Sequence, residues 1–168
     1  MAQNSKKTFT SLGYSHLDTA EIVTLLNRFL ANYAVHQQKL RNFQWNLSGQ
    51  DFFDLKERFG SMYDRSEKEI DDVAWRIRLF GQVPFSNFSD YLKHSSVKEA
   101  KGNLTSYEMA KEVLADIRIL LEILEQGILA ATEINDKGSE LLLQSITFSL
   151  EKEYWMLTEW MKQDRPSV

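Results

Sequence analysis

The chain has 168 residues and a mass of 19.6 kDa, with 43% hydrophobic residues, 26% charged residues and a formal net charge of −4. This length fits one domain, and the apolar share excludes an intrinsically disordered chain. The absence of cysteine excludes disulfides and thiolate metal sites, and the regularly spaced charges exclude a long membrane span. The negative charge argues against a DNA-coating surface on the folded body, although a basic tail could still bind DNA.

Apolar residues recur at three- and four-residue steps in four long stretches, which predicts four helices of about 25–30 residues each. The first is expected to begin at a capping box formed by Asp18 and Glu21 and to end at 46–49. The second is expected to stop at Gly81 and Pro84.

The third helix is expected to begin at a second capping box, Thr105 with Glu108, and to end at the turn signal of residues 135–138. Ser139 is then expected to cap the fourth helix. Residues 81–103 are long enough to run the length of a bundle, and their centre predicts a short helix capped by Ser89.

These elements predict an all-α, ferritin-like four-helix bundle, with a short extra helix in the long crossover between the second and third long helices. The expected organisation is a flexible N-terminal tail at 1–17, the bundle at 18–163 and a C-terminal tail at 164–168. The first residues lack an apolar signal core, so a cytoplasmic protein without a membrane partner is expected.

A ferritin-like bundle invites a search for a di-iron site, but the sequence contains no Glu-x-x-His. The three histidines, His16, His36 and His94, are too far apart in sequence to form a helical pair of ligands. His36 shares a helix stripe with Leu40 and Gln44, and a lone histidine there favours a packing role over ligation.

A row of acidic residues, Asp64, Glu67 and Asp71, lies along one side of the second predicted helix. Its ordinary interpretation is a solvated charged face, and its functional alternative is a metal site made of oxygen ligands.

Several motifs of this sequence resemble those of Dps proteins, the DNA-protection-during-starvation branch of the ferritin superfamily, also called mini-ferritins. The motifs are NFQWNLSG at 42–49, DFFDL at 51–55, FSDYL at 88–92, IND at 134–136 and EKEYWML at 151–157. The resemblance implies a hollow dodecameric shell with iron-oxidising sites at two-fold interfaces between subunits. It also implies hydrogen peroxide as the preferred oxidant, and DNA binding through basic tails in some members.

Of the five ligand positions that the resemblance implies, only Asp71 is retained. The two histidine positions hold Gln44 and Lys56, and two acidic positions hold Gly60 and Trp75. An amide is a weak ligand for Fe(II), a lysine adds positive charge, and glycine and tryptophan offer no suitable donor. The resemblance combined with these substitutions therefore predicts a degenerate ferroxidase site.

In the family the site joins two subunits, so Lys56 of one chain is expected to pair with Asp71 of its partner, with Trp75 packed over the pair; the alternative is that Lys56 points into solvent. The expected function is a Dps-like shell for DNA protection or iron-related storage, without ferroxidase activity. The alternative is an active mini-ferritin that oxidises Fe(II) with hydrogen peroxide at a non-standard site, for example around Asp64, Glu67 and Asp71. No cofactor is assigned, and iron is the one candidate.

Two further roles are considered. Lys6 and Lys7 form a DNA-binding tail or simply a solubilising one, and Asp136 with Glu140 lines a pore or serves as an ordinary turn and cap. Three other tryptophans are expected to pack: Trp45, Trp155 and Trp160.

Overall fold

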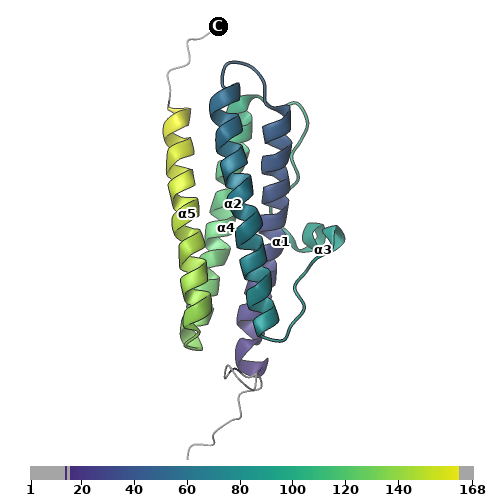
Figure 1. Ribbon diagram of the computed structural model, residues 1–168, viewed down its shortest axis with the longest axis vertical. Coiled ribbons are helices and arrows are strands. Elements are labelled where there is room, and N and C mark those ends of the chain that lie inside the picture. Colours follow the sequence, from purple (N-terminus) through teal and green to yellow (C-terminus); the bar gives the residue numbers. More distant parts are fainter. Residues whose placement is uncertain (1–13, 15, 163–168) are drawn as a thin grey trace, which may run out of the picture.

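The structure is a computed structural model that describes residue 14 and residues 16–162, with only the backbone for residues 16–18. Most of the predicted N-terminal tail, including Lys6 and Lys7, and the whole predicted C-terminal tail lie outside this range. Five helices form the described part (Figure 1): α1 (His16–Asn46), α2 (Phe52–Leu79), α3 (Phe88–His94), α4 (Ser106–Glu133) and α5 (Lys137–Met161). The predicted four long helices and the short crossover helix are confirmed.

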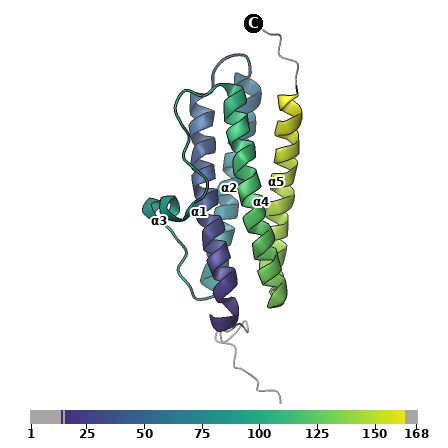
Figure 2. The same ribbon diagram turned by 180° about the vertical axis from the view of Figure 1, so that it is seen from behind.

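The four long helices form a bundle with ferritin-like connectivity. α1 packs against α2 and α4, and α4 packs against α5. The crossover from α2 to α4 runs back along the bundle beside α1, so α2 and α4 point in the same direction (Figures 1 and 2). α3 lies within this crossover and contacts α1. The all-α ferritin-like fold class is therefore confirmed.

The core is a continuous apolar cluster built from the predicted stripes of α1, α2, α4 and α5. Each stripe buries side chains against the facing helices, which supplies most of the stability of such helices. The largest fully buried side chains include four phenylalanines: Phe29, Phe43, Phe59 and Phe80. Among the described residues, no helix combines the length and the apolar character needed to cross a bilayer.

Of the three predicted helix ends in α1 and α2, two agree with the structure: the end of α1 and the end of α2. α1 stops at Asn46 and Gly49 follows with φ +90°, while Gly81, with φ +73°, follows the end of α2. Such backbone angles favour glycine because it has no Cβ. The predicted start of α1 was wrong: the helix begins at His16, so Asp18 lies inside its first turn and cannot be its N-cap.

The capping box at the start of α4 is confirmed, with the Thr105 hydroxyl accepting from the Glu108 amide. The return hydrogen bond from the Thr105 backbone amide lowers the pKa of Glu108. The predicted cap of α5 was wrong: Asp136, three residues earlier, accepts the amide of Ser139. A carboxylate that accepts first-turn amides suits the positive end of a helix.

The predicted cap of the crossover helix was also wrong. α3 begins at Phe88 with Asn87 as its N-cap, two residues before the expected Ser89. The Asn87 side chain makes no capping hydrogen bond to the backbone and instead donates to Asp90 at 3.2 Å.

Candidate functional site

Gln44 on α1 and Gly60 on α2 meet where these two helices pack against each other. Gly60 is buried, and a Cβ built on it would lie 2.6 Å from Nε2 of Gln44. The amide of Gln44 therefore occupies the space into which a side chain at position 60 would extend. Gln44 and Gly60 lie 16 residues apart in sequence, and the side chain of Gln44 fills the space at both positions.

Lys56 lies one helical turn before Gly60 and is exposed. Its ammonium lies 4.8 Å from the centroid of the Phe52 ring, a cation–π contact at the surface of α2. Asp71 and Trp75 lie further along α2, both exposed, with 69% of Trp75 accessible.

A single chain does not bring the two halves of the predicted site together. Gly60 and Asp71 are eleven residues apart on one helix, a rise of about 16 Å. Neither Lys56 nor Asp71 takes part in an ion pair within the described residues. The Lys56–Asp71 pair requires a second subunit and stays a prediction.

The acidic row Asp64, Glu67 and Asp71 is exposed along α2, as expected for a solvated face. In the part of the chain that is described, no three histidine or acidic side chains converge as a metal-binding group. Burial raises the pKa of Tyr91 in the crossover, and the negative charge of Asp71 raises it further.

A buried polar cluster links α1 and α4 inside the bundle. Asp116 on α4 lies between His36 and Lys39, with Oδ2 at 3.0 Å from Nδ1 of His36 and Oδ1 at 2.8 Å from Nζ of Lys39. All three residues are almost fully buried, and Lys39 also reaches Glu112 at 3.3 Å. The predicted packing role of His36 is confirmed. Of the other histidines, His94 stacks on Phe85 and the side chain of His16 is not described.

The cluster continues toward α2 through an aromatic stack. The ring of Tyr33 lies parallel to that of His36, 5.9 Å away, and its hydroxyl donates to Glu69. Burial raises the pKa of Tyr33 well above its usual value, and Glu69 adds to the shift. Burial also raises the pKa of Glu69, although the hydrogen bond from Tyr33 opposes this.

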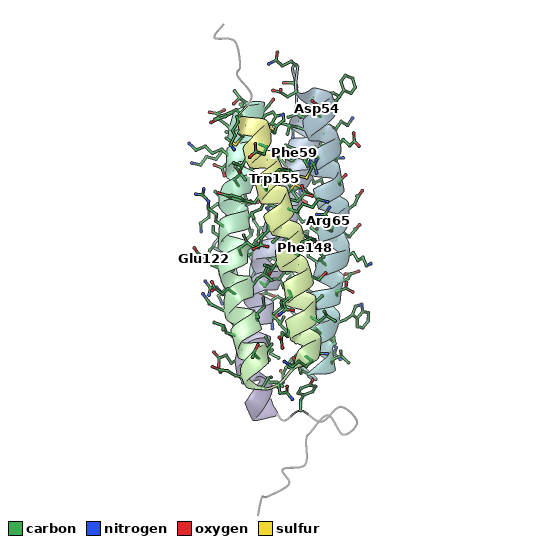
Figure 3. All side chains as sticks on the ribbon, turned by 90° about the vertical axis from the view of Figure 1, so that its left-hand side faces the viewer. Asp54, Phe59, Arg65, Glu122, Phe148 and Trp155 are labelled. Atoms are coloured by element: carbon green, nitrogen blue, oxygen red, sulfur yellow. The ribbon has the colours of Figure 1, made fainter. Side chains whose placement is uncertain are left out.

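α2 and α5 are joined by a third polar contact. The buried carboxylate of Glu153 accepts from Arg65 at 3.0 Å and from Arg58 at 3.3 Å. Figure 3 shows Arg65 on the face that α2 turns toward α5. The ion pairs of Glu153 engage both oxygens of this buried carboxylate, so it is not free to bind a metal.

Asp136 at the turn between α4 and α5 is fully buried and caps α5. It accepts from Arg76 of α2 and, at 3.1 Å, from the hydroxyl of Tyr14. Glu140 pairs with Lys137 at 2.7 Å. The turn-and-cap role is confirmed for Asp136, and the pore concerns an assembled shell and stays a prediction.

The prediction that the tryptophans pack was wrong for two of them, as far as a single chain is concerned. Trp45 is 70% exposed and Trp155 61% exposed, while Trp160 packs partly against the core. Exposure of such large apolar side chains is typical of surfaces that a partner covers.

Sequence and structure comparisons place this geometry among known proteins. A family model for the ferritin-like domain matches residues 23–165. General stress protein 20U of Bacillus subtilis is 33% identical over 84% of this chain and 97% of its own length. DNA protection during starvation protein 2 of Bacillus anthracis is 34% identical over 85% and 98%.

The fold agrees with solved structures of Dps proteins. The Vibrio cholerae Dps, described as a member of a broad superfamily of ferritin-like diiron-carboxylate proteins, superposes with a TM-score of 0.87 at 30% identity, covering 90% of this chain and 96% of its own. A Listeria innocua Dps mutant with two histidines replaced by glycine gives a TM-score of 0.82 at 26% identity, covering 85% and 95%. The chain belongs to the Dps, or mini-ferritin, family of ferritin-like proteins.

Proposed function

We propose that this protein is a shell-forming stress-protection protein of the Dps type in which protein side chains have replaced the iron-oxidising site. The proposal includes assembly into a dodecameric shell and a role in DNA protection or iron-related storage without ferroxidase chemistry. Relatives named for general stress and for DNA protection during starvation, which align over nearly the whole chain, support the protective role.

The contact between Gln44 and Gly60 carries the proposed loss of iron chemistry. An acidic ligand at position 60, which the family resemblance implies for an iron-binding member, would need the space that the Gln44 amide occupies. An amide oxygen is a weaker donor to Fe(II) than imidazole or carboxylate, and glycine has no side chain to bind a metal.

The remaining two substitutions also weaken Fe(II) binding. Lys56 carries a positive charge that repels a cation, and Trp75 replaces a carboxylate by an indole. We propose that Lys56 pairs with Asp71 of a second subunit and that Trp75 packs over this pair. The exposure of these side chains in the single chain supports the proposal, because they are available to a partner.

The experiment that tests the proposal is an anaerobic titration with Fe(II) followed by addition of hydrogen peroxide, monitored by ultraviolet absorbance. The wild-type protein is expected to show no saturable Fe(II) binding and no oxidation faster than that of free Fe(II). Stoichiometric binding followed by fast oxidation, both lost in Asp71→Ala, would instead show a working ferroxidase.

A restored variant provides the positive control. The changes are those that the resemblance implies for a complete site: Gln44→His, Lys56→His, Gly60→Asp and Trp75→Glu, with Asp71 kept. This variant is expected to bind Fe(II) and to oxidise it faster than wild type. A restored variant that assembles but stays inactive would show that these five positions do not decide the chemistry.

DNA protection is proposed through the N-terminal residues Lys6 and Lys7, which lie outside the described residues. Many copies in one shell add their phosphate contacts, and each contact weakens as salt rises. A gel shift of plasmid DNA is expected at low salt and is expected to disappear in Lys6→Ala/Lys7→Ala. A shift that persists in the double variant would assign DNA binding to another surface.

A further inference from the structure

A groove between α4 and α5 combines an apolar floor with an acidic rim. It encloses about 450 Å³, and its floor contains Leu121 and Ile128 of α4. The lining contains no lysine or arginine. Its three exposed carboxylates belong to Glu122, Glu125 and Glu151.

Large apolar side chains continue this surface toward the turn between α4 and α5. Leu129 lines the groove and is exposed, Phe148 is 71% exposed, and Leu141 is 70% exposed in the first turns of α5. Figure 3 shows Glu122 on α4 and Phe148 on α5 on the same face of the molecule. A patch that is both apolar and acidic suits a partner that is both apolar and basic.

The first thirteen residues of this chain, MAQNSKKTFTSLG, have that chemistry. They contain Lys6, Lys7, Phe9 and Leu12, and no acidic residue. Their charge is therefore opposite to that of the groove.

The segment also joins the bundle at the correct end of the groove. Tyr14, which follows it, donates its hydroxyl to Asp136 at the turn between α4 and α5, and its ring packs edge-on against Phe80 at 5.3 Å. The groove lies between the two helices that this turn joins, and Leu129 in its lining is four residues before the end of α4 at Glu133.

We propose that residues 1–13 dock along the α4–α5 groove of their own chain, with Phe9 and Leu12 on its apolar part and Lys6 and Lys7 against its carboxylates. This docking role of the α4–α5 surface is separate from shell assembly and from the loss of the iron site, which the proposed function describes.

The lengths of the segment and of the groove agree. An extended chain covers about 3.3 Å per residue and a helix about 1.5 Å. Phe9 therefore lies up to about 17 Å from Tyr14, and Phe148 lies about 17 Å from the start of α5. Lys7 reaches up to about 23 Å, and Glu151 lies about 21 Å from the start of α5.

A second copy of the chain fits the groove less well. In a two-fold contact, the same acidic rim would face itself, and like charges brought together without cations destabilise an interface. DNA is excluded from this face by the same carboxylates. Docking would hold Lys6 and Lys7 away from phosphates, so tail docking and DNA binding would compete.

The absence of cysteine allows a direct test by engineered disulfides. Phe9→Cys with Phe148→Cys introduces the only two thiols of the chain. The control pairs Phe9→Cys with Phe53→Cys, because Phe53 is 79% exposed at the start of α2, at the other end of the bundle. Mild oxidation of the full-length protein is followed by non-reducing electrophoresis and by mass spectrometry.

The proposal predicts that the 9/148 pair forms an intrachain disulfide at least about tenfold faster than the control pair, a difference worth about 1.4 kcal/mol in free energy. Equal rates would overturn it. A disulfide between chains, or fast dimerisation of Phe148→Cys alone, would also overturn it, because a second copy would then cover the groove.

Charge reversal tests whether the carboxylates guide the segment. Lys6→Glu/Lys7→Glu in the 9/148 protein is expected to slow cross-linking several-fold, and adding Glu122→Lys with Glu125→Lys is expected to restore it. Glu122 and Glu125 are exposed, and Lys6 and Lys7 lie outside the described residues. An unchanged circular dichroism spectrum checks that each variant is folded. Cross-linking that is fast and does not change with these charges would contradict the proposed placement of Lys6 and Lys7 against the carboxylates.

Discussion

The side-chain amide of Gln44 lies where a side chain at Gly60 would extend, 2.6 Å from the position of a Cβ there. Alanine in a helix interior is normally about 1 kcal/mol more stabilising than glycine. In wild type we expect Gly60→Ala to be close to neutral, because displacing the Gln44 amide offsets this gain.

In a Gln44→Ala background the same change is expected to stabilise by about 1 kcal/mol. Urea unfolding of the four proteins of this double-mutant cycle measures the difference. Gly102→Ala, where a Cβ meets nothing within 4 Å, is the control for steric contact. Equal effects of Gly60→Ala in both backgrounds would show that the two positions are independent.

Lys56 and Asp71 are expected to pair between subunits, so their charges should be exchangeable. Each single change, Lys56→Asp or Asp71→Lys, is expected to weaken the dimer contact, by about 3–5 kcal/mol if that contact buries the pair. The double change should restore assembly. Sedimentation velocity measures this, and Lys68→Asp, an exposed charge reversal on the same helix, is the control. Single variants that assemble like wild type would contradict the pair.

Asp116 satisfies two buried basic side chains, so its removal should be costly. Asp116→Ala leaves the buried Lys39 with only the partly exposed Glu112, and the expected loss is about 3–5 kcal/mol of unfolding free energy. Adding Lys39→Met should recover a large part of this loss. Lys137→Met, which breaks the exposed pair with Glu140, is expected to cost less than about 1 kcal/mol.

Urea unfolding compares these variants. If the losses of unfolding free energy from Lys39→Met and Asp116→Ala simply add in the double variant, the two side chains do not act as a pair.

The Tyr33–Glu69 hydrogen bond should make stability depend on pH. Burial raises the pKa of Glu69, and the Tyr33 hydroxyl opposes this. A carboxyl group whose pKa is raised by folding makes the unfolding free energy fall as pH rises through the interval between its unfolded and folded pKa. Tyr33→Phe removes the opposing donor, so it should raise the pKa of Glu69 further and widen this interval.

Tyr33→Phe is therefore expected to cost about 1–3 kcal/mol near pH 7 and less near pH 4, where Glu69 is mostly protonated in the folded and unfolded chain. Urea unfolding at both pH values and a carboxyl NMR titration measure the two effects. Tyr154→Phe, which loses a surface hydrogen bond from Arg118, is the control without pH dependence. An equal loss at both pH values would contradict the assignment.

The sequence predicted the fold well because the helices depend on local patterns. Apolar spacing identified all four long helices, and the capping box at Thr105 was found because both of its members lie within one turn. The starts of α1 and α5 were placed wrongly because several polar residues near each start can serve as caps. At α5 the contacts of Asp136 with Arg76 and Tyr14, which are distant in sequence, decide between them.

The site was predicted in part. The resemblance pointed to positions 44 and 60, but the contact between Gln44 and Gly60 depends on how α1 packs on α2, which no local pattern contains. The buried Asp116 cluster was missed. Its one sequence signal is Asp116, which lies inside the apolar stripe of the third long helix beside Ile117. A buried aspartate needs a basic partner, and here that partner comes from another helix.

The central claim is that no iron binds where Gln44, Lys56, Gly60 and Trp75 stand. Anomalous scattering at the iron edge from crystals soaked in Fe(II) tests it most directly, with the restored variant as the positive control. We predict no ordered iron within coordination distance of Asp71 in wild type and a clear peak in the restored variant. An ordered iron beside Asp71 in the wild-type crystal, at ordinary metal–ligand distances, would contradict the account.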